Sequence, residues 1–587
     1  MLDALLKKAG ITKPGFSRKR VKWFISFSSN GRYTGVIPST EKAGSEYNFC
    51  PNLSQPEMVG GKEMRSQFLI DSLQTVTLYL KDNISKDDRE RYEKKHNYFC
   101  KLLSDVSAVI PSIVVASQGL SSEDVLERIR SDLKQLKAKG TDNATVMVDN
   151  IVFLERDEWH KWWCTFRKSL PKSPVSDRKM VCLATGEIVT PVSTQPKIKG
   201  LAGVGGLSTG DVLAGFDKEA FQSYGLEQAE NAAMSEEAAT AYAETLSYLI
   251  EKKGVRFGKN ALITYWFIEA VPEQDDPLSW LIEPAEQTEA DAELKAHRLL
   301  NSIREGRRSD LANNRYTALM LSGAAGRVMI REIMEGSFED LVININKWFN
   351  DLAIVARDGT KLIKQPKFFS LVNAIEFLSK DGRILRNIDD VPASLIGDLW
   401  RSAIAAGPIP LSAVSRAIIR IRSDMVSDSP LLETRFSLIK SYLIRKGDDD
   451  MKPYLNPEHP HPAYQCGRLL AVLARLQRAA LGDVGAGVVQ RYYTAASQTP
   501  GLILGRLMAN AKNHLGKLEK GLAYWYEDRL AEICGHIKDA VPKILTLEEQ
   551  TLFALGYYQQ IAYLNVGKEE KQDTAIDNIN KEKEKAI

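Results

Sequence analysis

Apolar residues in the first part of the chain fall in short runs separated by turn residues. KWFISFSSNGRYTGVIP places Asn30-Gly31 between two strand-like runs, which predicts a β-hairpin. ATVMVDNIVFLE predicts another strand, and KDDRERYEKKHNYFCKLLSDVSAV has the apolar spacing of a helix. We therefore expect residues 1–170 to form an α+β region.

Residues 171–285 have a different pattern. VCLATGEIVTPVS predicts a strand and a turn, NAAMSEEAATAYAETLSYLIEKK an amphipathic helix, and NALITYWFIEAV a further strand. Between the first two elements lies QPKIKGLAGVGGLSTGD, residues 195–211, which we call the glycine-rich loop. We expect a central α/β region in which this loop connects regular elements.

Helical spacing dominates the second half of the chain. Residues 286–388 are expected to be mostly helical, with a strand around Tyr316 to Met320 and a long helix from about Phe338. Almost every apolar run in residues 389–565 has helical spacing, which predicts a helical bundle. The predicted fold class is thus α+β, with mixed α/β amino-terminal and central regions followed by a carboxy-terminal α-helical bundle. Residues 566–587 are charged and poor in large apolar side chains, so we expect disorder there.

Composition narrows the class of protein without deciding its function. The 587 residues are 44% hydrophobic and 26% charged, as in ordinary globular proteins, and the net charge of +3 favours no particular partner. No window of about 20 apolar residues is present, so we expect a soluble, cytoplasmic protein without a membrane partner. The six cysteines form no CxxC pair, and prolines follow both His459 and His461, so no metal site is predicted.

The motifs of common enzymes are missing. The sequence has no GxxxxGK[ST] phosphate loop and no HExxH motif. GLSTG matches GxSxG around Ser208, but a nucleophile elbow needs a strand that runs directly into the serine, whereas a long glycine-rich segment precedes this one. We therefore predict no catalytic residue and no cofactor.

Basic residues gather at three places, and each set has a functional and a structural interpretation. On predicted helices they could follow a phosphate backbone, or they could simply be a solvated helix face. These helical candidates are Arg416, Arg420, Arg468, Arg475 and Lys512. An amino-terminal cluster contains Arg18, Lys19, Arg20 and Lys22. In the glycine-rich loop, lysines flank backbone N–H groups that could hold phosphate, and the alternative is a mobile surface loop.

Two ordered blocks of sequence resemble one known family. CLATGEIVTPVSTQPKIKGLAGVGG, AFQSYGLEQAENAAMSEEAATAYAETLSYLI and TYWF resemble the central block of the large subunit of the type I-C CRISPR Cascade complex. AYQCGRLLAVLARLQRAA, RYYTAASQTPGLILGRL and LTLEEQTLFALGYYQQ resemble the closing block of the same family. The similarity extends from Met1 to Leu564.

The resemblance implies a non-catalytic subunit of an RNA-guided antiviral complex. Such a subunit binds near the 5′ end of the crRNA, recognises the protospacer-adjacent motif in target double-stranded DNA, and promotes duplex opening and R-loop formation. The guide RNA then reads the sequence by base pairing. The implied partners are the backbone subunits, the guide-processing subunit, the small subunits and a helicase-nuclease. In this family the small subunit is made by internal translation, for which Met451 is our first candidate start and Met425 the second.

Candidate contacts follow from residue type. Glycine permits close approach to a DNA groove, and the flanking polar groups supply hydrogen-bond donors. The candidates for recognising the adjacent motif are Lys197, Lys199, Gly205, Gly206, Ser208 and Thr209, with Asn30 and Arg32 of the hairpin as second choice. The amino-terminal and helical basic residues named above are candidates for the backbone of a DNA strand or of RNA. A nuclease with an unrecognised active site and a helical scaffold that binds only protein remain as alternatives.

Overall fold

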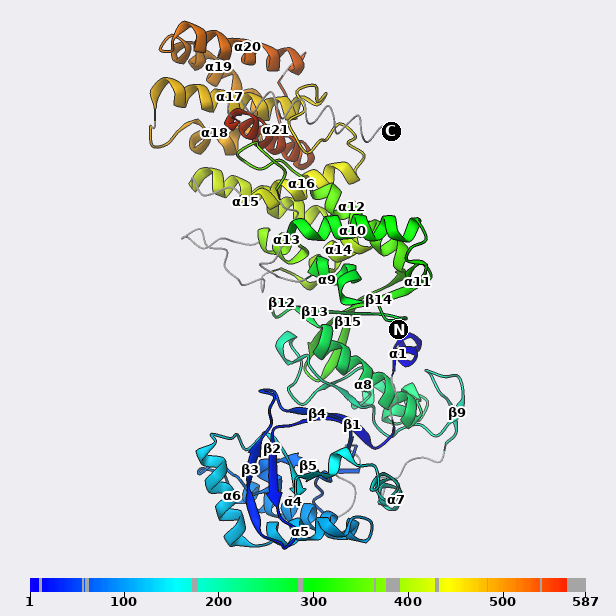
Figure 1. Ribbon diagram of the computed structural model, residues 1–587. Helices are drawn as coiled ribbons and strands as arrows, with labels where there is room; N and C mark the ends of the chain where they lie inside the picture. The colour runs from blue at the N-terminus through cyan, green and yellow to red at the C-terminus, as the bar shows by residue number, and fades with distance from the viewer. Residues whose placement is uncertain are drawn as a thin grey trace. The chain divides into compact units, whose positions relative to one another are not determined.

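The computed structural model divides the chain into two compact units (Figure 1). It describes residues 1–9, 13–54, 57–58, 63–170, 178–282, 289–363, 366–375, 391–427, 432–482, 484–538 and 541–566. The first unit contains Met1–Ala202, Gly206–Lys252 and Gly323–Met329. The second contains Gly203–Gly205, Lys253–Ser322 and the residues from Ile330 onward. The predicted central region, residues 171–285, contributes to both units.

A mixed sheet forms the centre of the first unit. Strand β2 pairs antiparallel with β3 and parallel with β6, in the order β3-β2-β6-β5, and β7 pairs with β6. All five residues of β2 are buried. The predicted hairpin at Asn30-Gly31 and the strand predicted in ATVMVDNIVFLE are both confirmed. The strands are β2 (Trp23–Phe27), β3 (Tyr33–Pro38), β5 (Ile70–Ser72), β6 (Asn143–Val148) and β7 (Ile151–Val152).

Helices pack on this sheet and complete its core. Phe27, Val146, Phe99 and Trp163 belong to one buried apolar cluster of aliphatic and aromatic side chains. The Ser85 hydroxyl accepts a hydrogen bond from the Asp88 N–H and so caps the predicted helix α4. The helices are α1 (Leu2–Lys8), α3 (Leu73–Val76), α4 (Lys86–Asp105), α5 (Val114–Leu120), α6 (Glu123–Gln135) and α7 (His160–Ser169).

The other elements of the first unit include the short strands at the two ends of the glycine-rich loop. Strand β10, near the start of the loop, pairs antiparallel with β11, which begins at the last residue of the loop, and Val212 of β11 pairs in parallel with Arg327. The helix predicted in NAAMSEEAATAYAETLSYLIEKK is confirmed as α8. These elements are β1 (Phe16–Val21), β4 (Ser45–Pro51), β8 (Met180–Val181), β9 (Ile188–Val189), β10 (Lys197–Ile198), β11 (Asp211–Val212) and α8 (Glu236–Lys253).

One strand that we did not expect lies among the helices of residues 286–388. The strand predicted around Tyr316 is present as β14 (Arg315–Ala324), but it is followed by β15 (Arg327–Ser337), which we did not predict. Val328, Met329, Ile333 and Met334 are spaced as on a helix, and this spacing concealed the strand. Strands β12 (Val255–Phe257) and β13 (Ala261–Phe267) continue the sheet, with β13 antiparallel to both β12 and β14.

Helices make up most of the remainder of the second unit, which confirms the predicted bundle over the described residues. Helix α12 (Phe338–Leu352) begins where expected, because the Ser337 hydroxyl accepts the Asp340 N–H. The other helices are α9 (Pro277–Ile282), α10 (Glu289–Arg304), α11 (Ser309–Ala312), α13 (Phe368–Ala374), α14 (Ala393–Ile404), α15 (Leu411–Ser427), α16 (Glu433–Arg445), α17 (Pro462–Leu481), α18 (Val488–Ala496), α19 (Pro500–Leu515), α20 (Lys520–Ile537) and α21 (Leu547–Asn565). The predicted tail lies outside the described residues from 567 onward.

Helices α17 and α21 approach each other closely at two glycines. A Cβ atom on Gly467 would lie 2.0 Å from the Phe553 carbonyl oxygen, and one on Gly556 would lie 2.1 Å from the Tyr464 carbonyl oxygen. Side chains cannot fit between backbones at these distances, so each helix needs glycine where it faces the other. This contact holds the centre of the bundle together.

Candidate functional site

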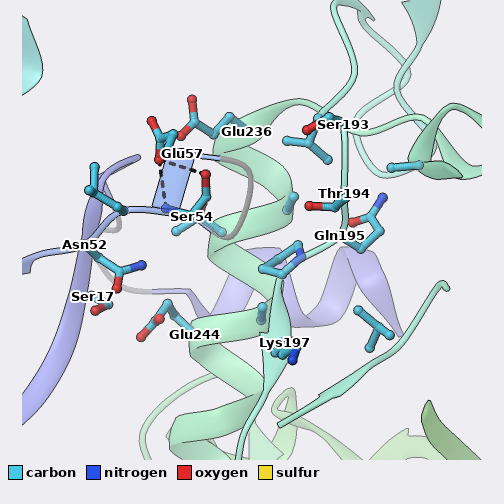
Figure 2. Close-up of a pocket in the computed structure, with 18 of the residues that line it drawn as sticks. Ser17, Asn52, Ser54, Glu57, Ser193, Thr194, Gln195, Lys197, Glu236 and Glu244 are labelled. Carbon is cyan, nitrogen blue, oxygen red and sulfur yellow. Dashed lines mark hydrogen bonds between the residues drawn. The ribbon is translucent and has the colours of Figure 1, made fainter. Parts of the chain in front are cut away.

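A pocket of about 860 Å³ opens within the first unit. Its walls come from segments that are far apart in the sequence: Ser17 on β1, Asn52 just after β4, Thr194 and Lys197 at β10, and Glu244 on α8. Figure 2 shows Ser17, Asn52 and Glu244 together on one side, with Thr194 on the other. Folding of the first unit therefore creates a site that no single motif contains.

One end of the pocket is held by a buried arginine. Arg167 Nη2 lies 2.7 Å from a Glu57 carboxylate oxygen and 2.6 Å from one of Glu236, at the start of α8. Glu57 also accepts hydrogen bonds from the Ser54 N–H at 2.8 Å and the Ser54 hydroxyl at 2.7 Å. The positive charge of Arg167 therefore compensates the charges of both carboxylates. Its ion pair with Glu236 joins the end of α7 to the start of α8.

Glu244, further along α8, places another carboxyl group in the wall of the pocket. Burial raises the pKa of Glu244, against the opposing charges of Lys199, Arg18 and Lys19. Its carboxylate accepts the Arg18 backbone N–H at 3.4 Å. Gln195 is fixed nearby, because its amide donates to the Ala232 carbonyl at 2.9 Å and accepts the Tyr242 hydroxyl at 3.0 Å. This wall of the pocket therefore holds the Glu244 carboxyl group, whose pKa is raised, and the Gln195 amide, which two hydrogen bonds fix in one orientation.

The glycine-rich loop, which supplies Lys197, Lys199 and Thr209 to this pocket, has a defined fold. Both carboxylate oxygens of the fully buried Asp211 accept the Leu207 N–H, at 3.0 and 3.2 Å. The Gly206 N–H donates to the Leu201 carbonyl, and a Cβ on Gly206 would lie 2.3 Å from Asp211. Gly205 has a φ of +90°, which other residues rarely adopt. The loop is therefore a hydrogen-bonded turn.

Lys199 also lines a second pocket, of about 270 Å³, together with Arg18, Lys19 and Arg20 of β1. The structure thus brings together two basic sets that the sequence analysis treated separately. We call Lys197, Lys199, Arg18, Lys19 and Arg20 the basic rim. Lys22, predicted with the amino-terminal set, lies outside both pockets and pairs with Asp142 at 3.0 Å.

Charges within the basic rim are not equivalent. Arg18 and Arg20 lie 3.6 and 3.2 Å from Glu46, and both also pair with Glu251. Burial lowers the pKa of Lys19 to about 8, and its amine donates to the Pro51 carbonyl at 2.9 Å. Lys197 and Lys199 are exposed, and within the described ranges neither forms an ion pair. They are the cations of the rim that a ligand can reach most readily.

The remaining loop and hairpin candidates lie elsewhere. Ser208 is exposed, follows a turn and lines neither pocket, so the strand that a nucleophile elbow needs is absent from this described segment. Asn30 and Arg32 are exposed, and neither lines a pocket. The Asn30 side chain accepts the Ser28 hydroxyl at 2.5 Å and the Arg32 N–H at 3.1 Å, which stabilises the turn itself.

Two of the predicted strand-contacting arginines are not on the surface. Arg468 is 2% exposed, pairs with Glu532 at 2.9 Å and donates to Gln560 at 2.9 Å, so its charge is satisfied inside the bundle. Arg420 is 7% exposed. Of the other helical candidates, Arg416 and Arg475 are partly buried, and Lys512 is exposed on α19.

Histidines and acidic residues in the described ranges do not gather into a metal site. In the part of the chain that the structure describes, no group of three or more His, Cys, Asp or Glu residues could hold a metal ion. His459 is 2% exposed beside Asp448, and His461 caps α17 by accepting the Ala463 N–H. In the same ranges, no helix combines the length and the apolar character that a membrane crossing requires.

Comparison with known families decides the identity. The model of the CRISPR-associated protein family Cas_Csd1 matches residues 2–564. The chain belongs to the Cas_Csd1 family. A Cas_Csd1 protein is the large subunit of a type I-C Cascade complex, which confirms the resemblance drawn from the two sequence blocks. No curated protein matches the chain.

Proposed function

We propose that this Cas_Csd1 subunit recognises the protospacer-adjacent motif in duplex DNA through the glycine-rich loop and the basic rim. One observation supports this proposal above the others: Lys199 lines the same pocket as Arg18, Lys19 and Arg20. Loop and strand therefore offer one continuous set of cations. Phosphate contacts from such a set fix the register of a duplex, and groups on the loop can then reach base edges.

The distribution of ion pairs supports a division of labour within the rim. Glu46 and Glu251 hold Arg18 and Arg20 in place, which leaves Lys197 and Lys199 to neutralise phosphates. Each neutralised phosphate releases counterions and makes binding dependent on salt. In this proposal the subunit binds near the 5′ end of the crRNA, promotes duplex opening and R-loop formation, and recruits the helicase-nuclease without catalytic activity of its own.

The test is a double substitution in the assembled complex. Lys197→Ala with Lys199→Ala should weaken binding to DNA and reduce the slope of log affinity against log salt by up to about 2. The measurement compares targets with the correct and with a scrambled adjacent motif. Lys86→Ala with Lys134→Ala, two exposed lysines outside both pockets, is the control. Wild-type affinity of the loop variant for both targets would contradict the proposal.

We further propose that Met451 is the internal start of a small subunit. Met451 lies between α16 and α17, whereas Met425 lies inside α15, so a start at Met451 divides no helix. Both glycines of the α17–α21 contact follow Met451 and would be retained. Expression of the gene with Met451→Leu should abolish a small carboxy-terminal product on a denaturing gel. An unchanged product would exclude Met451 and favour Met425.

A further inference from the structure

The pocket of about 860 Å³ is larger than phosphate contacts at its edge require. Ligand pockets in proteins commonly have about 300–1,000 Å³, enough for a nucleotide-sized molecule. Its lining combines polar side chains, such as those of Thr194 and Asn52, with apolar ones, among them the aromatic Phe216. Lys197 and Lys199 also line it. Space, hydrogen-bonding groups and cations therefore occur together.

Two buried donors in this lining lack a protein partner. Ser17 is 5% exposed, and its hydroxyl makes no hydrogen bond among the described residues. Arg167 is 9% exposed, and its Nε is likewise unpartnered in that part of the chain, although its Nη2 is paired. Buried polar groups are nearly always satisfied in native proteins. Neither atom has accessible surface, so a ligand in the pocket would meet the Ser17 hydroxyl only after that side chain turns toward it.

The lining groups are complementary to the edge of a nucleobase. An asparagine amide both donates and accepts, a carboxylate accepts from an exocyclic amine, and a hydroxyl does either. Asn52, Glu244 and Ser17 lie together on one wall of the pocket, as Figure 2 shows. Proteins that read a base outside the duplex hold it by such hydrogen bonds and by stacking. Phe216 is available for the stacking.

We infer that the pocket binds one nucleotide extruded from the DNA at or beside the adjacent motif. This inference rests on the proposed function, because the same rim that grips the duplex supplies the phosphate contacts at Lys197 and Lys199. Extrusion of a base requires unstacking and unpairing. Contacts between the pocket and the extruded base offset the free energy of unstacking and unpairing. The first base pair therefore opens where the protein holds the duplex.

The experiment uses the assembled complex and duplex targets that carry 2-aminopurine at one position at a time, on either strand, in and next to the adjacent motif. This base fluoresces weakly when stacked, so extrusion should raise its signal several-fold at one position. Thr194→Phe should fill the pocket and abolish the rise, while DNA affinity stays within about threefold because the rim is intact. Thr40→Phe, an exposed threonine outside both pockets, should change neither.

Ser17→Ala separates a ligand contact from a structural role. Loss of one neutral hydrogen bond should lower the extruded fraction by about three- to tenfold. Thermal stability should not fall, because the variant removes a buried hydroxyl that has no partner among the described residues. A merely structural serine would show the reverse: lower stability and an unchanged fluorescence rise.

Several results would overturn the inference while leaving motif recognition intact. These are salt-dependent DNA binding without brightening at any position, a rise that persists in Thr194→Phe, and a rise seen only when the guide RNA carries the probe. Abolition of the rise by excess dAMP would indicate a site for free nucleotides and would also overturn it. Failure of the proposed function is distinct, since the Lys197 and Lys199 variant would then bind DNA normally.

Discussion

Basic residues in the two units differ in where their charges go. In the second unit, Arg468 is buried against Glu532, and Arg445 lies 2.8 Å from Asp351 with both side chains less than 10% exposed. In the first unit, Lys197 on β10 and Lys199 just after it are exposed. A row of arginines on a helix is thus weak support for nucleic-acid binding when the helix packs against several others. Helix α17 contacts α18, α19, α20 and α21.

The largest expected effect tests the structural assignment of Arg468. Arg468→Met should lower the free energy of unfolding by about 1–3 kcal/mol, because it leaves the buried side-chain oxygens of Gln465 and Gln560 without this donor, whereas Glu532 keeps its ion pair with Arg529. Arg478→Met, on the exposed side of the same helix, should change it by less than about 0.5 kcal/mol. Denaturant titration measures both. Equal stability of the two variants would show that Arg468 contributes no more to folding than an exposed arginine, and would contradict its structural assignment.

A smaller effect concerns Lys19, the rim cation that burial makes easiest to deprotonate. Its pKa of about 8 lies below the ordinary 10.5, so the free protein loses this charge as the pH rises through 8. Cys50, whose own pKa burial raises to about 11, stays neutral there, while Lys199, Asp71 and Glu244 act on Lys19 through their charges. DNA affinity should therefore fall by up to about tenfold between pH 7 and 9.

Lys19→Arg provides the matched comparison, because arginine stays charged across this range. The variant should keep its pH 7 affinity at pH 9, as measured by titration with labelled duplex. Parallel pH curves for wild type and variant would assign the pH dependence to another group. The sign for stability is opposite: the unfolded chain holds the Lys19 proton up to its ordinary pKa, so Lys19 makes folding more favourable as the pH rises from 8 to 10.5.

Local pattern was enough for much of the fold. The turn residues at Asn30-Gly31, the helical spacing from about Phe338 and the amphipathic period of α8 each lie within the element they predict or within a few residues of it. Strand β15 was missed because its apolar residues are spaced as on a helix, and only pairing with distant strands reveals it. Sequence patterns thus predict the turns and helices that neighbouring residues determine, but not a strand that depends on pairing with distant residues.

The candidate site was predictable only in part. Lys197, Lys199 and Thr209 were expected from the glycine-rich loop, and they line the pocket. Ser17 and Arg167 were missed, since a lone serine in a strand and a lone arginine in an aromatic helix carry no motif. Their relevance arises from the tertiary contact of β1, α7 and α8. Arg468 shows the converse, a sequence signal that packing assigns to structure.

Asp211 gives the glycine-rich loop a property that its composition conceals. Glycine loses more conformational entropy than other residues when it becomes ordered, and a loop that orders only on binding weakens its complex by that amount. Here the buried carboxylate of Asp211 and the Gly206 N–H have ordered the turn during folding. The conformational entropy of the loop is therefore lost during folding, which lowers the stability of the first unit. A ligand then binds to a loop that is already ordered.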